Sequence, residues 1–111
     1  YIIHLAARTD LNEKYSLDGY AANIQGVRNI MDAASGLNDL RRVIIASSML
    51  VCKLGFIPKT FDDYAPNSLY GESKVLTEKI VKEYNINLLE HIDLTFTKYS
   101  GILRSSFSFS K

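Results

Sequence analysis

The sequence predicts a single α/β domain built around a parallel sheet, and three observations lead to this prediction. The segment Tyr1–Ala7 is a short, almost continuous apolar run, and Val43–Ala46 is a second run rich in β-branched residues. Such runs are typical of strands that are buried on both faces of a parallel sheet. Between them, apolar side chains recur at helical spacing. A strand, a helix and a strand in this order predict a βαβ unit.

Two helices are predicted from the spacing of apolar residues. The first spans Leu17–Ala34, and Gly36 is well placed to end it. Its expected buried face carries Tyr20, Ile24, Val27, Ile30, Met31 and Ala34. The second spans Tyr70–Tyr84, and we expect Asn85–Asn87 to break it. Its expected buried side carries Val75, Leu76, Ile80, Val81 and Tyr84.

The remaining segments complete an alternating order of strands and helices. Met49–Ser68 predicts a long loop, and loops of this length are usually functional or disordered. Ile92–Thr97 predicts a third strand, and the tail Arg104–Lys111 predicts either an edge strand or a frayed end. Ligands of open α/β sheets bind beyond the carboxyl ends of the strands. The candidate site segments are therefore Ala6–Arg8, Ser47–Ser48 and the residues after Thr97.

The composition limits the classes of function. The 111 residues fit one domain over the whole chain, 1–111. The net charge of +1, with scattered basic residues, predicts no nucleic-acid partner and no anionic membrane. A single cysteine, Cys52, excludes an internal disulfide and a cysteine-based zinc site, and it favours a cytoplasmic location. No apolar run approaches the roughly 20 residues that cross a bilayer.

Tyr70 and Lys74 are the strongest candidates for chemistry. Their spacing of four residues on a predicted helix places both side chains on one face. A phenol with a pKa near 10 is a poor base at neutral pH, and a nearby ammonium is expected to lower that pKa. The tyrosine could then exchange a proton with a substrate hydroxyl. Ser48 follows the preceding strand and could hold the substrate oxygen.

Each candidate also has an ordinary structural interpretation. A tyrosine and a lysine at this spacing occur often by chance. His4 reads as a packed, hydrogen-bonded histidine, Asn23 as a buried amide that satisfies backbone groups, and Arg8 as a solvated loop cation. Cys52 reads as a small packing residue, and Asp62-Asp63 as solvent-facing or turn-forming residues.

Taken together in order, five segments resemble the extended short-chain dehydrogenase/reductase family, in particular its NAD-dependent sugar epimerase/dehydratase group. The segments are "IIHLAAR" (Ile2–Arg8), "NIQGVRNIMDAA" (Asn23–Ala34), "RVIIASSMLV" (Arg42–Val51), "DDYAPNSLYGESKVLTEK" (Asp62–Lys79) and, more weakly, "LTFTKYSGIL" (Leu94–Leu103). The resemblance implies a partial doubly wound, Rossmann-type parallel sheet. It comprises strands four to six of the complete fold with the intervening helices, so that the domain is truncated at both ends.

The resemblance also implies roles for individual residues. Tyr70 corresponds to the general acid/base, Lys74 to its partner that also binds the nicotinamide ribose, and Ser48 to the hydroxyl that contacts the substrate oxygen. Three further sets fall on cofactor-contacting positions: Leu5, Ala6, Ala7 and Arg8; Asn23, which in the family either lies near the cofactor or braces the adjacent strand; and Tyr99, or alternatively Ser100. No metal site is implied.

Two departures from the family pattern matter. None of the six glycines forms the G-x-x-G-x-x-G turn that holds the cofactor pyrophosphate. We therefore expect the isolated chain to bind dinucleotide weakly and to be inactive, and Tyr1–Ala7 to be an open apolar edge that invites association. Met49 and Leu50 occupy places where dehydratases of the group carry Asp-Glu, which argues against dehydratase chemistry.

The leading functional hypothesis is a fragment of an NAD- or NADP-dependent epimerase that acts on a nucleotide sugar, with a homodimer as the full-length form. One alternative is an NADP-dependent reductase of the hydroxysteroid or dihydroflavonol type. Another is a non-catalytic binding protein that kept the dinucleotide fold, although such a protein has no need for Ser48, Tyr70 and Lys74 together.

Overall fold

The computed structural model describes residues 1–60, 62–87, 93–100 and 103–109, and side chains as far as Tyr84. In chain order the elements are β1 (Ile2–His4), the 3-10 helix η1 (Leu17–Tyr20), α1 (Ala21–Ser35), β2 (Arg42–Ala46), the 3-10 helix η2 (Met49–Val51), α2 (Leu69–Asn87), β3 (Asp93–Ser100) and β4 (Leu103–Phe109). This sequence of strands and helices confirms the predicted α/β class.

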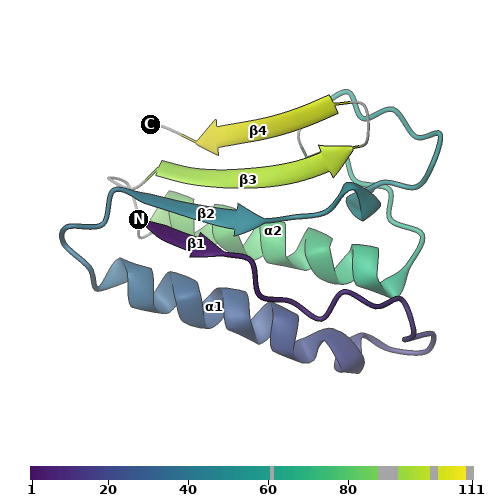
Figure 1. Cartoon of the computed structure of the whole chain (residues 1–111), viewed down its shortest axis with the longest axis horizontal. Coiled ribbons are helices and arrows are strands. Elements are labelled where there is room, and N and C mark those ends of the chain that lie inside the picture. The colour runs from purple at the N-terminus through teal and green to yellow at the C-terminus, as the bar shows by residue number, and fades with distance from the viewer. Residues whose placement is uncertain (61, 88–92, 101–102, 110–111) are drawn as a thin grey trace.

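One four-stranded sheet has the order β1-β2-β3-β4 (Figure 1). The first three strands run parallel, with Ile3 opposite Ile44 and Ile44 opposite Thr95. β4 pairs antiparallel with β3, so the serine-rich tail forms the edge strand that was one of its two expected states. β4 thus adds an antiparallel edge strand to the predicted parallel sheet. Only two residues separate β3 from β4, whereas a parallel return needs a crossover of a dozen or more.

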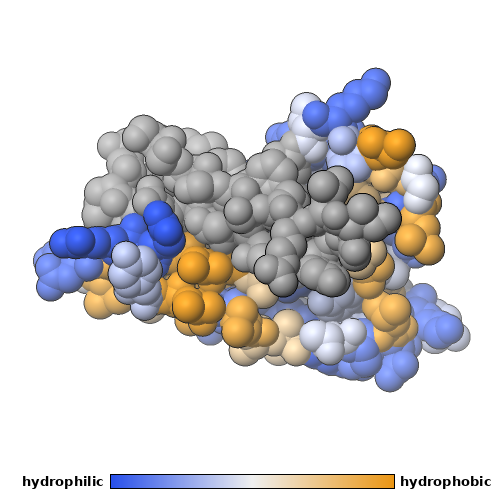
Figure 2. Space-filling view, turned by 45° about the horizontal axis from the view of Figure 1, so that its top comes forward, coloured by the Kyte–Doolittle hydropathy of each residue, from blue (hydrophilic) through white to orange (hydrophobic). Residues whose placement is uncertain are grey.

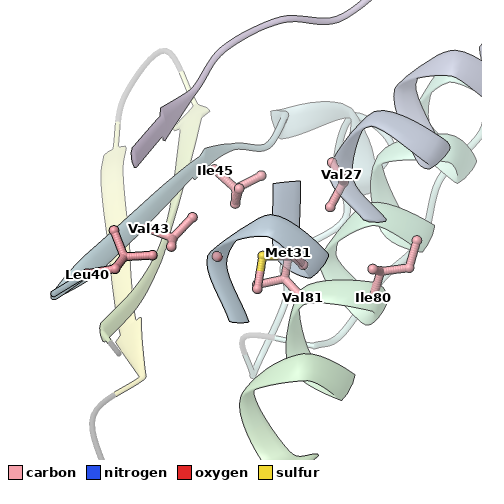
Figure 3. Close-up of a cluster of buried hydrophobic side chains, with 8 residues drawn as sticks. Val27, Met31, Leu40, Val43, Ile45, Ile80 and Val81 are labelled. Carbon is pink, nitrogen blue, oxygen red and sulfur yellow. The ribbon is translucent and has the colours of Figure 1, made fainter. Parts of the chain in front are cut away.

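Helices α1 and α2 lie side by side on one face of the sheet (Figure 1). Figure 3 shows how buried side chains from both helices meet those of β2 in one core. That core comprises Val27, Met31, Ala34, Leu40, Val43, Ile45, Ile80 and Val81. Burial of this apolar area is the main favourable contribution to folding, at about 25 cal/mol per Å².

The first helix closely follows its predicted face. Tyr20, Val27, Met31 and Ala34 are buried, while Ile24 and Ile30 are partly buried against the core. Its first turn is the 3-10 helix η1, where the Ser16 side chain accepts a hydrogen bond from the Asp18 backbone amide. Gly36 caps the carboxyl end of α1, as predicted, with a right-handed backbone (φ −91°).

The second helix is buried over more of its surface than its apolar residues predict. Ser73, Lys74, Thr77 and Glu78 are buried together with Val75, Ile80 and Val81. Leu76, which was expected on the buried side, is 36% exposed. In this polar row Lys74 and Glu78 contact the carboxyl end of β2, whereas Ser73 and Thr77 donate to carbonyls within α2. The row displaces the apolar face around the helix. The helix also continues through Asn87, so the expected break at Asn85–Asn87 is wrong.

β1 is shorter and more exposed than the run Tyr1–Ala7 predicts. It ends at His4, and Ile3 is 62% exposed, so this strand is not buried on both faces. In the described sheet β1 pairs only with β2, and its other edge is open, as expected. Apolar surface remains on the described part of the molecule (Figure 2). Its most exposed members include Tyr1, Ile3, Leu5, Tyr15, Leu54 and Ile57.

The segment between β2 and α2 is a loop held at both ends. Cys52 and Ala65 form an isolated parallel bridge, in which the Lys53 amide donates to the Ala65 carbonyl at 2.7 Å. Gly55 adopts φ +82° at the exposed tip, a conformation that favours glycine. Among the described residues, no helix combines the length and apolar character that crossing a bilayer requires.

Gly71 marks the closest approach of α2 to η2. A Cβ atom on Gly71 would lie 2.3 Å from the Leu50 carbonyl oxygen, which is backbone and cannot swing away. We predict that Gly71→Ala lowers the free energy of unfolding by roughly 1–3 kcal/mol, because the helix must shift to relieve the overlap. Urea unfolding followed by circular dichroism measures the change.

Gly26 in α1 is the matched control. A Cβ atom there meets nothing within 4 Å, so Gly26→Ala should raise the free energy of unfolding by about 0.5–1 kcal/mol. Equal effects of the two substitutions would contradict the close approach at Gly71.

Candidate functional site

The candidate site lies where the carboxyl ends of β1 and β2 meet the start of α2. Ser48 comes two residues after β2 and caps η2, because its hydroxyl accepts a hydrogen bond from the Leu50 amide at 3.1 Å. Tyr70 lies in the first turn of α2, and Lys74 lies one turn further on. The structure therefore brings the three predicted acid/base residues to one edge of the sheet.

Tyr70 is enclosed by two neighbouring hydroxyl side chains. It is 7% exposed, it lies next to the Ser48 side chain, and its ring meets the Tyr20 ring edge-to-face at 5.7 Å between centroids. Burial raises the pKa of Tyr70 above its usual value, and the neighbouring Ser48 hydroxyl opposes this rise only in part. The predicted lowering of this pKa is therefore wrong for this structure, and Tyr70 holds its proton at neutral pH.

Lys74 is buried but partnered. Its Nζ donates a hydrogen bond to the Ala46 carbonyl at 2.8 Å, and the residue is 5% exposed. Burial lowers the pKa of Lys74, while the negative charge of Glu78 raises it. The partly buried His4 of β1 feels the same ammonium, which adds to the effect of burial in lowering the pKa of His4. His4 is thus a partly packed side chain beside the candidate site.

Asn23 braces the segment that follows β1. Its Oδ1 accepts from the Arg8 backbone amide and its Nδ2 donates to the Arg8 carbonyl, both at 2.8 Å. A buried amide that satisfies both polar groups of one residue fixes that backbone firmly. Of the two family roles considered for Asn23, the contacts match the bracing role.

The Arg8 side chain is engaged within its own loop. Its guanidinium donates to Asp10 at 2.6 and 2.9 Å, to Glu13 at 2.7 Å and to the Gly19 carbonyl at 3.0 Å. It also lies 5.4 Å from the centroid of the Tyr20 ring. The Arg8 side chain therefore stabilises the loop after β1 and packs on Tyr20, whose ring contacts Tyr70.

The other predicted cofactor-contacting residues lie in two places. Leu5 and Ala6 are exposed and Ala7 is partly exposed, directly after β1. Small side chains at Ala6 and Ala7 leave this backbone accessible. The backbone of Tyr99 belongs to β3, but its side chain lies outside the described residues, as does that of Ser100.

Three residues that the sequence reasoning did not assign to the site, Tyr20, Tyr64 and Glu78, complete its surroundings. Tyr20 is fully buried and donates to the Asp10 carbonyl at 2.6 Å. Glu78 accepts hydrogen bonds from Ser47 and, at 2.7 Å, from the Tyr64 hydroxyl. A signal for Glu78 was present, because the spacing of four between Tyr70 and Lys74 continues one step further. No comparable pattern indicated Tyr64, which lies in the loop.

The residues interpreted as structural have ordinary contacts. The Cys52 thiol donates to the Asp63 carbonyl at 3.4 Å. Asp62 accepts from the Thr60 hydroxyl and Asp63 from the Lys59 amide, so the acidic pair forms turns as expected. Within the described residues, no group of three metal-ligating side chains comes together.

A surface groove lies at the opposite end of the strands. It is lined by Tyr1 and Ile2 at the start of β1 and by residues 36–40 before β2. The amino ends of parallel strands seldom carry the ligand site of an open α/β sheet. The groove is therefore not part of the candidate site.

The tyrosines give the fold a pH dependence that can be measured. Burial is the largest cause that raises the pKa values of Tyr64 and Tyr70. A raised pKa in the folded state contributes stability that is complete below the unfolded value, near 10, and is lost as the pH rises through the folded value. We predict that the free energy of unfolding falls above about pH 10 and falls less in the double variant Tyr64→Phe/Tyr70→Phe. Urea unfolding at pH 8 and pH 11 measures this, and equal losses in both proteins would contradict it.

Comparison with known proteins gives one family match and several structural ones. The model of the NAD-dependent epimerase/dehydratase family matches residues 1–97. No curated protein matches the chain significantly. Among solved structures, a tyrosine-to-phenylalanine variant of UDP-glucuronic acid 4-epimerase from Bacillus cereus, in complex with a fluorinated substrate analogue and NAD, has a TM-score of 0.74 at 23% identity over 87% of this chain.

Two further structures agree with this match. UDP-glucose 4-epimerase from Brucella ovis, in complex with NAD, has a TM-score of 0.70 at 22% identity over 87% of this chain. A short-chain dehydrogenase/reductase superfamily protein from Agrobacterium tumefaciens with bound NAD has a TM-score of 0.67 at 31% identity over 85% of it. The chain spans 31%, 30% and 29% of the lengths of these three proteins.

The likeness to the two epimerases establishes a shared Rossmann-type fold, and the family model covers most of the chain. The chain belongs to the NAD-dependent epimerase/dehydratase family of extended short-chain dehydrogenases/reductases.

Proposed function

We propose that this chain carries the acid/base part of an NAD-dependent nucleotide-sugar epimerase, with Ser48, Tyr70 and Lys74 as its working residues. The observation that carries the proposal is the placement of Tyr70, in the first turn of α2, next to Ser48 after the carboxyl end of β2, with the buried Lys74 one helical turn further on. A binding protein has no need to bury an ammonium group one helical turn from Tyr70, because burying a charge costs free energy.

The residues at this edge fit the nicotinamide end of a dinucleotide. Leu5 and Ala6 are exposed after β1, and Tyr70 and Lys74 offer a hydroxyl and an ammonium for ribose oxygens. NAD, when bound, would take a hydride from a sugar carbon and return it. The pyrophosphate end has no comparable place, because no glycine-rich turn occurs in these 111 residues.

In the proposed reaction, Ser48 holds the reacting substrate oxygen and Tyr70 exchanges a proton with it. Because Tyr70 keeps its proton at neutral pH, it is ready to donate to a substrate carbonyl oxygen. Oxidation of a hydroxyl needs the phenolate, so that half of the reaction should speed up as the pH rises toward the pKa of Tyr70. Lys74 supplies positive charge one turn away, which favours the phenolate when it forms.

The proposal names NAD because two similar epimerase structures contain it, and a nucleotide sugar because one of them contains a UDP-sugar. Met49 and Leu50 lie in η2 where the Asp-Glu pair of dehydratases would stand, so epimerisation is favoured over dehydration. A reductase of this family would instead consume reduced cofactor with net formation of an alcohol. The product of the reaction therefore separates the two activities.

The decisive variant is Tyr70→Phe, made in an intact-length protein that contains this chain. We predict a fall in kcat of at least ~100-fold with a much smaller loss of cofactor affinity, because the exchanged proton is removed while Lys74 keeps its proposed contact with the ribose. Epimerisation of UDP-sugars, followed by chromatography of the products, measures the rate. Tyr84→Phe is the matched control, since Tyr84 lies on the same helix and hydrogen-bonds Asp32 away from the site. Unchanged activity of Tyr70→Phe would reject the proposal.

The isolated chain gives a second test. Without a glycine-rich turn it should bind NAD and NADP with dissociation constants well above the micromolar range and should not turn over substrate. Isothermal titration calorimetry of the purified 111-residue chain measures this affinity. Micromolar binding of either dinucleotide would contradict the expectation that the pyrophosphate grip lies outside these residues.

A further inference from the structure

Glu78 is a fully buried carboxylate near the middle of α2. A buried carboxylate is costly unless hydrogen bonds or opposite charge compensate it. The Ser47 hydroxyl donates to its Oε1, and the Tyr64 hydroxyl donates to its Oε2 at 2.7 Å. The two donors come from the end of β2 and from the loop before α2. One side chain on α2 therefore holds both segments.

Lys74 and Glu78 form hydrogen bonds with two adjacent residues at the end of β2. Lys74 donates to the carbonyl of Ala46, and Glu78 accepts from the side chain of Ser47. The two side chains are four residues apart on one helix, which places opposite charges on the same buried face. In poorly solvated surroundings such charges attract each other more strongly than they do in water. The direction of the Glu78 effect on Lys74, a raised pKa, agrees with this placement.

The loop that Glu78 holds is the one that connects Ser48 to Tyr70. Tyr64 also accepts a hydrogen bond from Lys82 at 3.1 Å, so its hydroxyl links two residues of α2. The next residue, Ala65, donates its amide to the Val51 carbonyl at 3.0 Å. The return of the loop is thereby fixed between η2 and α2.

We propose that Glu78 is a positioning residue for Ser48, Tyr70 and Lys74. Its hydrogen bonds hold the end of β2 and the loop before α2 against α2, and its negative charge stabilises the buried lysine ammonium. The inference deepens the proposed function and rests on it, since the lysine must stay charged to assist Tyr70. A purely structural buried acid would hold the loop but would not govern the titration of Lys74.

The electrostatic part is tested by titrating Lys74 in the purified chain. The 13Cε and 15Nζ signals of labelled lysines are followed by NMR against pH, and Lys74→Arg assigns the signal. Glu78→Gln is nearly isosteric and removes only the charge, so the acid ionisation constant of Lys74 should rise tenfold or more. His4, the other titratable group that senses Lys74, is followed in the same spectra.

The matched control is Glu72→Gln, which removes the same charge from the exposed first turn of α2. It should change the ionisation constant of Lys74 less than threefold. Equal constants in wild type and Glu78→Gln, or equal effects of the two glutamine variants, would overturn the proposal.

The positioning part is tested by hydrogen exchange of the backbone amides of Val51, Lys53 and Ala65. The hydrogen bonds of these amides close the loop. Tyr64→Phe and Ser47→Ala should each speed the exchange of these amides at least tenfold, while the ionisation constant of Lys74 stays unchanged. If Glu78→Gln does not fold, Glu78→Asp decides, since it keeps the charge but shortens the reach. In Glu78→Asp the ionisation constant of Lys74 should stay within about threefold of wild type, and the loop amides should lose their protection against exchange. Unchanged protection, or a tenfold change in the ionisation constant of Lys74, would overturn the proposal.

Neither measurement needs cofactor or substrate. An unchanged ionisation constant of Lys74 in Glu78→Gln would rule out the proposed role of Glu78, and it would leave the Tyr70→Phe test of the proposed function intact. Failure of that activity test would remove the acid/base assignment while the coupling between Glu78 and Lys74 could still be observed.

Discussion

The arrangement of the site depends on the burial of the Lys74 ammonium against the end of β2. An ammonium removed from water costs several kcal/mol unless it finds charge and hydrogen-bond partners. The Ala46 carbonyl and the Glu78 charge provide these partners, so α2 must pack with its polar row toward the strand end. This constraint places Tyr70, one turn earlier, beside Ser48. It also requires glycine at position 71, where the helix meets η2.

Much of the fold could be predicted from local patterns, and the exceptions have physical reasons. The apolar run before Ala46 and the helical spacing from Tyr20 to Ala34 gave correct elements because burial there is apolar. For α2 the pattern misplaced Leu76, because half of the buried face is polar and apolar spacing cannot reveal it. The antiparallel β4 follows from the short connection rather than from composition.

The candidate site was only partly predictable from the sequence. Ser48, Tyr70 and Lys74 were proposed because their spacing and order carry a chemical meaning. The structure brings them to one edge of the sheet, and their catalytic roles stay a prediction. The pKa of Tyr70 was predicted in the wrong direction, because burial depends on tertiary packing by Tyr20. For Asn23 a cofactor-proximal and a bracing role were both considered, and for Arg8 a cofactor contact and a loop cation; their described contacts hold the loop after β1. The proposed acid/base residues and the residues that hold the neighbouring loop thus lie at the same carboxyl ends of β1 and β2.

The contact between Tyr70 and its two neighbours is the most direct test of this account. In the purified chain, nuclear Overhauser effects should connect the Tyr70 ring protons to the Tyr20 ring and to the β protons of Ser48, because the rings meet edge-to-face at 5.7 Å. Their observation in a folded chain would place the hydroxyl pair at the carboxyl end of β2. A folded chain in which the Tyr70 ring shows neither connection would contradict the proposed site.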